Sequence, residues 1–298
     1  RLKRLIPFRQ YHLYHHSPSQ SQHPSYVHAN LIKNGTLEHL TPTNYLLSLY
    51  LKSKDLGCAL KLFDEMPDRD VRSWTMLISG LIQVGSCRMA LDIFVEMHKE
   101  GAVPNKFTFS SVFKCCSRLN EFRMGKSVHG WIVCNAVFVD TALENSVLDF
   151  YVKCGSFSSA KRFFELMGDK DIVSWNIVIN AYIQTCDMET ALGLFRRLPV
   201  KDVSSWNTII DGHLRNDYHG IAMELLYEMV KGGFALSKET FSIALGLAAS
   251  LTALDFGKQI HGHLLRSGLH FDGFFDGYRI YSEWKAARSS ENIQYNGH

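Results

Sequence analysis

Apolar residues recur along the chain at helical spacing. Trp206, Ile209 and Ile210, for example, follow one another at intervals of three and one, which places them on one face of an α-helix. Such stretches of about a dozen residues come in pairs, and a short polar break such as KCGS at 153–156 separates the two members. No alternation typical of β-strands competes with this pattern. The chain is therefore predicted to fold into helix-turn-helix hairpins.

The hairpin pattern repeats in a fixed register. The phrase ALKLFDEM at 59–66 returns in four variants, and GKSVHGWI at 125–132 recurs as GKQIHGHL at 257–264, with the related SYVHANLI at 25–32. Aligning these phrases gives seven units of 31 or 35 residues: 40–70, 71–105, 106–140, 141–171, 172–202, 203–237 and 238–272. A single hairpin cannot bury its apolar face, whereas stacked hairpins share one continuous core. We therefore expect an all-α superhelical solenoid.

Some repeated positions have the character of a core, and others do not. Packing is the expected role of the recurring small and aromatic residues Ala59, Ala90, Ala160, Ala191, Ala222, Phe63, Phe94, Phe164, Phe195, Trp74, Trp175 and Trp206. The residue after each Trp (Thr75, Asn176 and Asn207) is polar and lies about 100° away around the helix. Because equivalent positions of stacked hairpins line up, these residues form a row of different polar side chains that suits the recognition of a polymer.

The last residue of each unit is Asp, Asn or Ser. The seven residues are Asp70, Asn105, Asp140, Asp171, Asp202, Ser237 and Asp272. These residue types are the preferred N-caps when they immediately precede a helix, so helix capping alone would explain them. Recognition of a ligand is the alternative, and the residues by themselves leave both roles open.

The chain resembles pentatricopeptide repeat proteins of the plant subclass whose repeats alternate in length and are termed P, L and S. The resemblance lies in DVSSWNTIIDGHLRN followed by AMELLYEM, in the GKxxHG of the units at 106 and 238, in NSVLDFYVKCG at 145–155 and in MPDRD at 66–70, and it spans residues 40–272. It implies a right-handed superhelical solenoid that binds single-stranded RNA. In such proteins each repeat recognises one base, through its fifth and last residues.

Applied to this sequence, the resemblance implies seven base-recognising pairs. They are Asn44 with Asp70 for U or C, Thr75 with Asn105 for A, Asn145 with Asp171 and Asn176 with Asp202 for U or C, Asn207 with Ser237 for C, and two L-type pairs whose bases stay open, Ser110 with Asp140 and Ser242 with Asp272. An Asn amide offers a donor and an acceptor to a pyrimidine, and a shorter Thr or Ser leaves room for a purine. With RNA parallel to the chain, the expected core is 5′-U-A-n-U-U/C-C-n-3′.

Both ends of the chain depart from the repeat. Residues 1–25 are basic, rich in Ser, Gln and His and free of acidic residues, which is typical of an organelle transit peptide. Arg and Leu dominate its start, which favours the mitochondrion, with the chloroplast as the alternative. Residues 26–39 match part of an L-type repeat, and the tail at 273–298 has lost the pattern. The extension and deaminase domains of the subclass are missing, so we expect a truncated member.

Charge and motifs bear on other classes of function. Five of the 32 basic residues precede Glu38, which leaves 27 against 29 acidic residues, so net charge gives no argument for nucleic-acid binding. A cytidine deaminase needs H-x-E and C-x-x-C; His98-Lys99-Glu100 matches the first, but no C-x-x-C occurs. The seven cysteines lie in apolar helical stretches and are expected to be small buried side chains. We therefore expect no enzymatic activity, no metal site and no cofactor.

A protein-binding helical scaffold is the alternative function. Its groove would carry apolar or charge-patterned residues rather than a row of Asn, Thr, Ser and Asp. The polar row favours a monomer that binds single-stranded organellar RNA and acts in RNA processing such as the recognition of C-to-U editing sites. An editing role would then require a deaminase supplied in trans. No apolar run approaches the roughly 18 residues of a membrane-spanning helix, so no membrane partner is expected.

Overall fold

The structure, a computed structural model, describes residues 23–266 except 38, 136 and 138. Over these residues the regular elements are α-helices, and no strand is present. The helices are α1 (Pro24–Lys33), α2 (Leu40–Lys52), α3 (Leu56–Glu65), α4 (Val71–Gln83), α5 (Cys87–Lys99), α6 (Lys106–Leu119), α7 (Phe122–Cys134), α8 (Thr141–Lys153), α9 (Phe157–Leu166), α10 (Ile172–Gln184), α11 (Met188–Arg197), α12 (Val203–Arg215), α13 (His219–Lys231), α14 (Lys238–Ser250) and α15 (Leu254–Arg266). The predicted all-α helical-repeat fold is confirmed.

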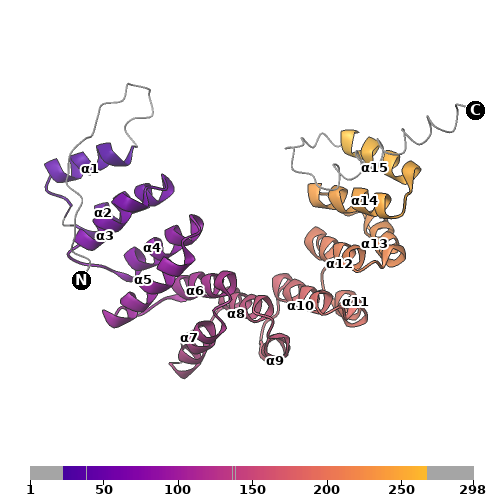
Figure 1. The fold of residues 1–298 in the computed structure, drawn as a ribbon, viewed down its shortest axis with the longest axis horizontal. Helices are drawn as coiled ribbons and strands as arrows, with labels where there is room; N and C mark the ends of the chain where they lie inside the picture. Colours follow the sequence, from indigo (N-terminus) through magenta and orange to yellow (C-terminus); the bar gives the residue numbers. More distant parts are fainter. Residues whose placement is uncertain (1–22, 38, 136, 138, 267–298) are drawn as a thin grey trace, which may run out of the picture. The chain divides into compact units, whose positions relative to one another are not determined.

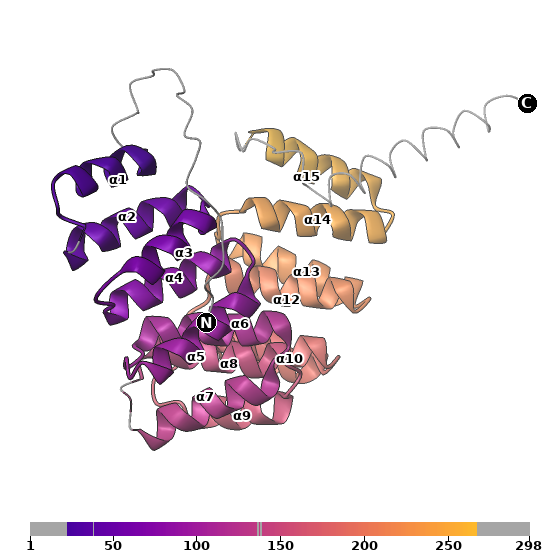
Figure 2. The same ribbon diagram turned by 60° about the vertical axis from the view of Figure 1, so that its left-hand side comes forward.

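The chain forms two compact units, which divide between Val128 and His129. In the first unit, α2 packs with α3 and α4 with α5, while α2, α4 and α6 also pack directly on one another in sequence. In the second unit the hairpins are α8 with α9, α10 with α11, α12 with α13 and α14 with α15 (Figure 1). Here α8, α10, α12 and α14 pack in sequence, and Figure 2 shows α14 and α15 of the last hairpin side by side. The even-numbered helices thus form one layer in each unit.

The repeated tryptophans pack between hairpins. The ring centroids of Phe63 and Trp74 are 4.8 Å apart, and those of Phe195 and Trp206 are 4.7 Å apart, in edge-to-face geometry. Trp74 and Trp206 are only 1% and 6% exposed. Trp175 is half-buried and packs edge to face on Phe164 of the preceding helix, α9. The predicted packing role of the tryptophans is therefore confirmed.

Glycines allow the even-numbered helices to approach closely. A Cβ added at Gly80 of α4 would overlap the side chain of Leu51 on α2. The same would happen at Gly212 of α12, which faces Ile183 of α10. A larger residue at either position would have to displace the Leu51 or Ile183 side chain, so the two glycines permit the close packing seen in the layer that carries the candidate site.

The turns and cysteines follow the sequence only in part. The predicted break at 153–156 is a turn, in which Gly155 has a φ of +72°. All seven cysteines lie among the described residues and none forms a disulfide; Cys58 and Cys154 are half-buried, while Cys87, Cys115 and Cys116 are buried. Burial was wrongly expected for Cys134 and Cys186, which are exposed. The first ends α7, and the second lies in the turn after α10 with a φ of +58°, so neither faces a core.

Both ends of the sequence lie largely outside the described residues. The predicted leader, residues 1–25, is described only from residue 23, and α1 begins inside it at Pro24 and packs on α2. Asp272 and the tail 273–298 are also outside. Among the helices that the structure describes, none combines the length and the apolar character needed to cross a membrane.

Candidate functional site

The last residue of each predicted unit caps the helix that follows. Asp70, Asn105, Asp171, Asp202 and Ser237 precede α4, α6, α10, α12 and α14, and each forms a reciprocal capping box with the third residue of its helix. Asp140 caps α8 by accepting a hydrogen bond of 3.0 Å from the backbone N–H of Leu143. The capping role that the sequence left open is therefore present.

Two asparagines at the fifth position contact the aspartate that ends their unit. Asn44 Nδ2 on α2 donates to Asp70 Oδ1 over 3.2 Å. Asn145 Nδ2 on α8 donates to both carboxylate oxygens of Asp171, over 3.0 and 3.1 Å. The capping aspartate therefore also orients an amide from the neighbouring helix.

Two further pairs meet through hydroxyl groups. Asn207 Nδ2 on α12 donates to Ser237 Oγ over 3.2 Å. Thr75 and Asn105 are bridged by Thr108, whose Oγ1 lies 2.7 Å from Thr75 Oγ1 and donates to Asn105 Oδ1 over 3.1 Å. The predicted partners are therefore adjacent even where they do not bond directly.

The remaining pairs differ. No hydrogen bond joins Asn176 and Asp202, although both are described. Ser110 lies on α6 in the first compact unit, whereas Asp140 precedes α8 in the second. Ser242 lies on α14 and is half-buried. Its predicted partner, Asp272, is outside the described residues. The structure thus brings together four of the seven predicted pairs.

The predicted base-recognising pairs carry both negative charge and unsatisfied acceptors. Burial raises the pKa of the Asp171 carboxyl, but hydrogen bonds from Ser174 and Asn145 outweigh it, so the pKa lies below the ordinary 3.8. Asp70 behaves in the same way, so both are carboxylates at neutral pH. The Oδ1 atoms of Asn44, Asn145 and Asn176 are buried and have no hydrogen-bond partner among the described residues, which is unusual for buried acceptors. Each of these oxygens is therefore an unused acceptor, and a ligand would reach it only if the side chains that cover it moved aside.

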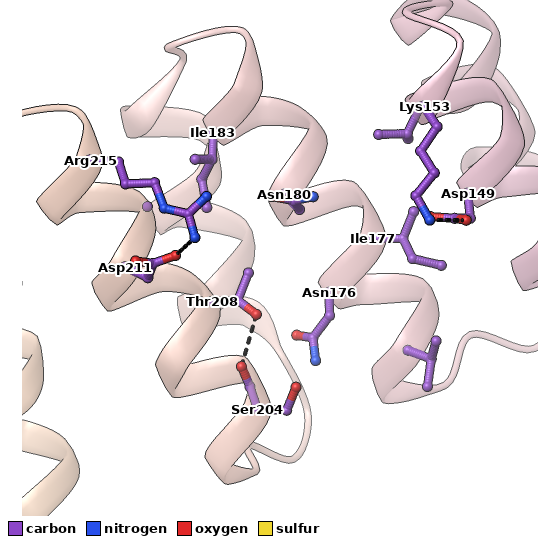
Figure 3. A pocket seen from close by; sticks show the side chains of 13 residues that line it. Asp149, Lys153, Asn176, Ile177, Asn180, Ile183, Ser204, Thr208, Asp211 and Arg215 are labelled. Atoms are coloured by element: carbon purple, nitrogen blue, oxygen red, sulfur yellow. Dashed lines mark hydrogen bonds and ion pairs between the residues drawn. The ribbon is translucent and has the colours of Figure 1, made fainter. Parts of the chain in front are cut away.

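A groove of about 490 Å³ runs across α8, α10 and α12. Asn176 and Asn180 line it, and in Figure 3 the Asn176 amide lies between α10 and the side chains of Ser204 and Thr208 on α12. Two basic side chains also line the groove, and each forms an ion pair with an aspartate one helical turn earlier on the same helix. Lys153 is 2.7 Å from Asp149, and Arg215 pairs with Asp211. The groove therefore combines asparagine amides and charged groups with apolar side chains such as Ile177 and Ile183.

Two features of the site were missed by sequence reasoning. One is a row of buried hydroxyl residues at the third position of the units, Ser73, Thr108, Ser174, Ser205 and Thr240. Their signal was a Ser or Thr three residues after a capping residue. The other is the acid and base at i and i+4, as in Asp149 and Lys153, which is a recognisable helix pattern.

Comparison with known families gives matches over most of the repeats. A profile of the PPR repeat family matches residues 69–118 and 201–249. A profile of the single PPR repeat matches residues 43–71, 145–172 and 173–203. The matched segments together run from 43 to 118 and from 145 to 249.

Curated relatives from Arabidopsis thaliana match the same region. A putative pentatricopeptide repeat-containing protein is 32% identical over 246 residues, which cover 82% of this chain and 31% of the relative. A chloroplastic pentatricopeptide repeat-containing protein is 32% identical over 244 residues, covering 82% and 24%. A putative mitochondrial one is 34% identical over 245 residues, covering 82% and 34%. The chain thus spans about a quarter to a third of the length of the relatives it matches.

Solved structures share the fold. The crystal structure of the pentatricopeptide repeat protein PPR10 from maize is 20% identical, with a TM-score of 0.54 over 92% of this chain and 46% of that one. PPR10 in complex with an 18-nt psaJ RNA element gives 18% identity and a TM-score of 0.55, over 92% and 48%. At this identity the likeness concerns the arrangement of helices.

Proposed function

The chain belongs to the pentatricopeptide repeat family, and from that premise we propose that it binds single-stranded RNA and recognises about one base per helix pair. One observation carries the proposal. Predicted base-recognising residues that are 26 or 30 positions apart in the sequence are hydrogen-bonded to each other in three pairs. A residue that served only as a helix cap would not need an amide from the neighbouring helix.

The unsatisfied acceptors support a ligand in this layer. Asn44, Asn145 and Asn176 each keep a buried Oδ1 without a partner, and such an atom costs about 1–3 kcal/mol unless something bonds to it. The edge of an RNA base carries N–H groups that can donate hydrogen bonds to such oxygens. That PPR10, which shares the fold, was crystallised with an RNA element supports the same class of ligand.

The groove favours RNA over a peptide. Its asparagines suit base edges, and Lys153 and Arg215 at its border suit phosphates, although each is held by an acid in the free protein. A protein-binding scaffold would instead need an apolar anchor pocket. The scaffold function therefore remains the second candidate.

The base order and the cellular role form the finer part of the proposal. The pairs specify 5′-U-A-n-U-U/C-C-n-3′, read parallel to the chain as a monomer. Relatives named as chloroplastic and mitochondrial support an organellar site, and the composition of residues 1–25 favours the mitochondrion. There the protein would select a site for RNA processing such as C-to-U editing, with a deaminase supplied in trans.

Fluorescence anisotropy of the purified chain tests the proposal. A labelled RNA with the core UAAUUCA should bind at least about tenfold more tightly than a scrambled RNA of the same composition. A variant with Ala in place of Asn44, Asn145 and Asn207 should keep its helical circular dichroism and lose the difference. Equal affinity of the parent chain for both RNAs would contradict the proposal and favour the scaffold.

A further inference from the structure

Five buried hydroxyl groups adjoin the predicted base-recognising pairs. They belong to Ser73, Thr108, Ser174, Ser205 and Thr240, each at most 1% exposed. Each is the third residue of a first helix and completes the capping box of the residue that ends the preceding unit. Their hydroxyl groups do not all bond to the same partner: those of Ser73 and Ser174 bond to the side chain of an aspartate cap, that of Ser205 to the backbone of one, and that of Thr240 to an asparagine of the neighbouring helix.

Where the cap is a carboxylate, the hydroxyl bonds to the cap. Ser174 Oγ donates to Asp171 Oδ1 over 2.8 Å, and Asn145 Nδ2 donates to the same oxygen over 3.0 Å. An ionised carboxylate only accepts hydrogen bonds, so Asn145 must turn its nitrogen toward Asp171. Its Oδ1 is buried and without a partner, so it is an unused acceptor that a base could bond once the side chains covering it move aside.

The Asn44 pair repeats this arrangement in the first unit. Ser73 Oγ donates to Asp70 Oδ1 over 2.6 Å, and Asn44 Nδ2 donates to that oxygen. The Oδ1 of Asn44 is likewise buried without a partner. A carboxylate cap thus leaves the fifth asparagine as an acceptor.

Where the cap is a serine, the hydroxyl of the third residue bonds to the asparagine itself. Thr240 Oγ1 donates to Asn207 Oδ1 over 2.8 Å, and Asn207 Nδ2 donates to Ser237 Oγ over 3.2 Å. The Ser237 and Thr240 hydroxyl oxygens lie 3.1 Å apart and close a ring of three side chains. Thr240 satisfies the amide oxygen of Asn207, which is therefore not an unused acceptor like that of Asn145, and the second amide hydrogen of Asn207 is a donor left for a ligand.

Uracil and cytosine differ in the same property. N3 of uracil carries a hydrogen and donates, whereas N3 of cytosine accepts. An asparagine left as an acceptor therefore fits uracil, and one left as a donor fits cytosine. We propose that Thr240 is a positioning residue that gives Asn207 its preference for C, and that a third-position hydroxyl takes part in base selection only where it bonds to the fifth-position asparagine itself. The proposal rests on the proposed RNA-binding function.

The Asn176 pair illustrates a third state. Ser205 Oγ donates to the backbone carbonyl of Asp202 over 2.8 Å, and no hydrogen bond joins Asn176 to Asp202. Neither partner fixes this amide. We therefore expect the fifth base to be selected between U and C less strongly than the fourth or the sixth.

Substitution of Thr240 tests the proposal with the whole chain and RNAs that differ at the sixth base, UAAUUCA and UAAUUUA. The parent should prefer C by about tenfold, as expected for one hydrogen bond made or left unmade. Thr240→Val keeps the shape of the side chain and removes its hydroxyl, so the ratio should fall to about twofold or less, or favour U. Thr240→Ser keeps the hydroxyl and should retain the preference for C.

Ser174→Ala is the matched control. It removes the hydroxyl of a capping box in the same compact unit of the fold as Thr240. That hydroxyl bonds to Asp171 and not to Asn145. Its preference for U over C at the fourth base, measured with UAAUUCA and UAACUCA, should stay within about twofold of the parent's. Thermal unfolding followed by circular dichroism should show a comparable loss of stability in both variants.

A second pair of variants decides the matter if Thr240→Val does not fold. Asp171→Ser places a serine cap beside Asn145 with the Ser174 hydroxyl still present, and the fourth base should change from U to C. Adding Ser174→Ala should remove the preference for C. An unchanged C-to-U ratio in Thr240→Val, or an equal loss of preference in Ser174→Ala, would overturn the inference. The inference would also be overturned if the parent bound the core RNA tightly but did not distinguish C from U at the sixth base. If the parent did not distinguish the core RNA from the scrambled RNA, the RNA-binding proposal itself would be overturned instead.

Discussion

The ring nitrogen Nδ1 of His129 lies 2.8 Å from the hydroxyl oxygen of Tyr151. His28 and Tyr50 make the same contact at 2.8 Å in the first unit, and in both pairs the rings meet edge to face. The histidines belong to the related phrases GKSVHGWI and SYVHANLI, so the phrase marks a hydrogen bond from an odd-numbered helix to the even-numbered helix after it.

Tyr151→Phe should lower the free energy of unfolding by about 1 kcal/mol, because it leaves a half-buried imidazole nitrogen without its partner. Tyr182→Phe is the control. Tyr182 occupies the equivalent place on α10, where the residue 22 positions earlier is Ala160 rather than His. Urea denaturation of the two variants should therefore show a shift for the first and almost none for the second. A similar shift in both would mean that the histidine contact does not stabilise the fold.

Stability should fall at mildly acidic pH. Burial lowers the pKa of His28, His129 and His213 below the ordinary 6.5, against a smaller opposing effect of Glu65 on His28 and of the Ile209 carbonyl on His213. The unfolded chain therefore takes up protons first as the pH drops below about 6.5, which favours unfolding. Urea midpoints should be constant above that pH and decrease toward pH 5. His213→Leu should reduce the slope, and a midpoint that rises toward pH 5 would refute the assignment.

Asp171→Ala and Asp187→Ala separate capping from recognition. Both aspartates cap a helix, α10 and α11, but only Asp171 also bonds to Asn145. Each variant should lose about 1–2 kcal/mol of unfolding free energy. Only Asp171→Ala should weaken the choice of the fourth base in anisotropy measurements, and a change of that choice in Asp187→Ala would point to an indirect effect of stability.

Trp206→Ala should be costly to the fold and neutral to base choice. The side chain is 6% exposed and packs on Phe195, so its loss should cost roughly 3–5 kcal/mol. At a temperature where the variant remains folded, the ratio of affinities for C and U at the sixth base should match the parent's. If that ratio collapses while the circular dichroism stays native, the tryptophan contacts RNA.

Exchanging Asn207 and Ser237 for Thr and Asn should shift the preference at the sixth base from C to A. The new pair copies Thr75 with Asn105, where a threonine hydroxyl and an asparagine amide are bridged by Thr108. Asn keeps the helix cap, so the melting temperature should change little. An unchanged preference for C would show that these two positions do not select the base.

The fold could be predicted from the sequence because it depends on local, repeated signals, and the same register predicted which residues lie adjacent in four of the pairs. Trp74 and Trp206 were assigned to packing from their place in the apolar stripe, and both are buried. The hydrogen bond between Thr240 and Asn207 could not be predicted, because it depends on how closely α12 and α14 pack and not on a local sequence pattern. Nor could the exposure of Cys186, which depends on where α10 ends.

On the proposed mechanism, the residue that ends each unit both caps a helix and helps to select a base, which limits how a new RNA target can evolve. Few side chains cap a helix well, and Asp, Asn, Ser and Thr are foremost among them. An exchange within this set keeps the helix start and, on the proposed mechanism, alters the base preferred. An exchange outside it weakens the fold and the recognition together, so selection for stability would remove it before its effect on targeting was tested. Because the last residue of a unit must also cap a helix, only a few residue types can occupy that position. The base specificities that can evolve are therefore few as well.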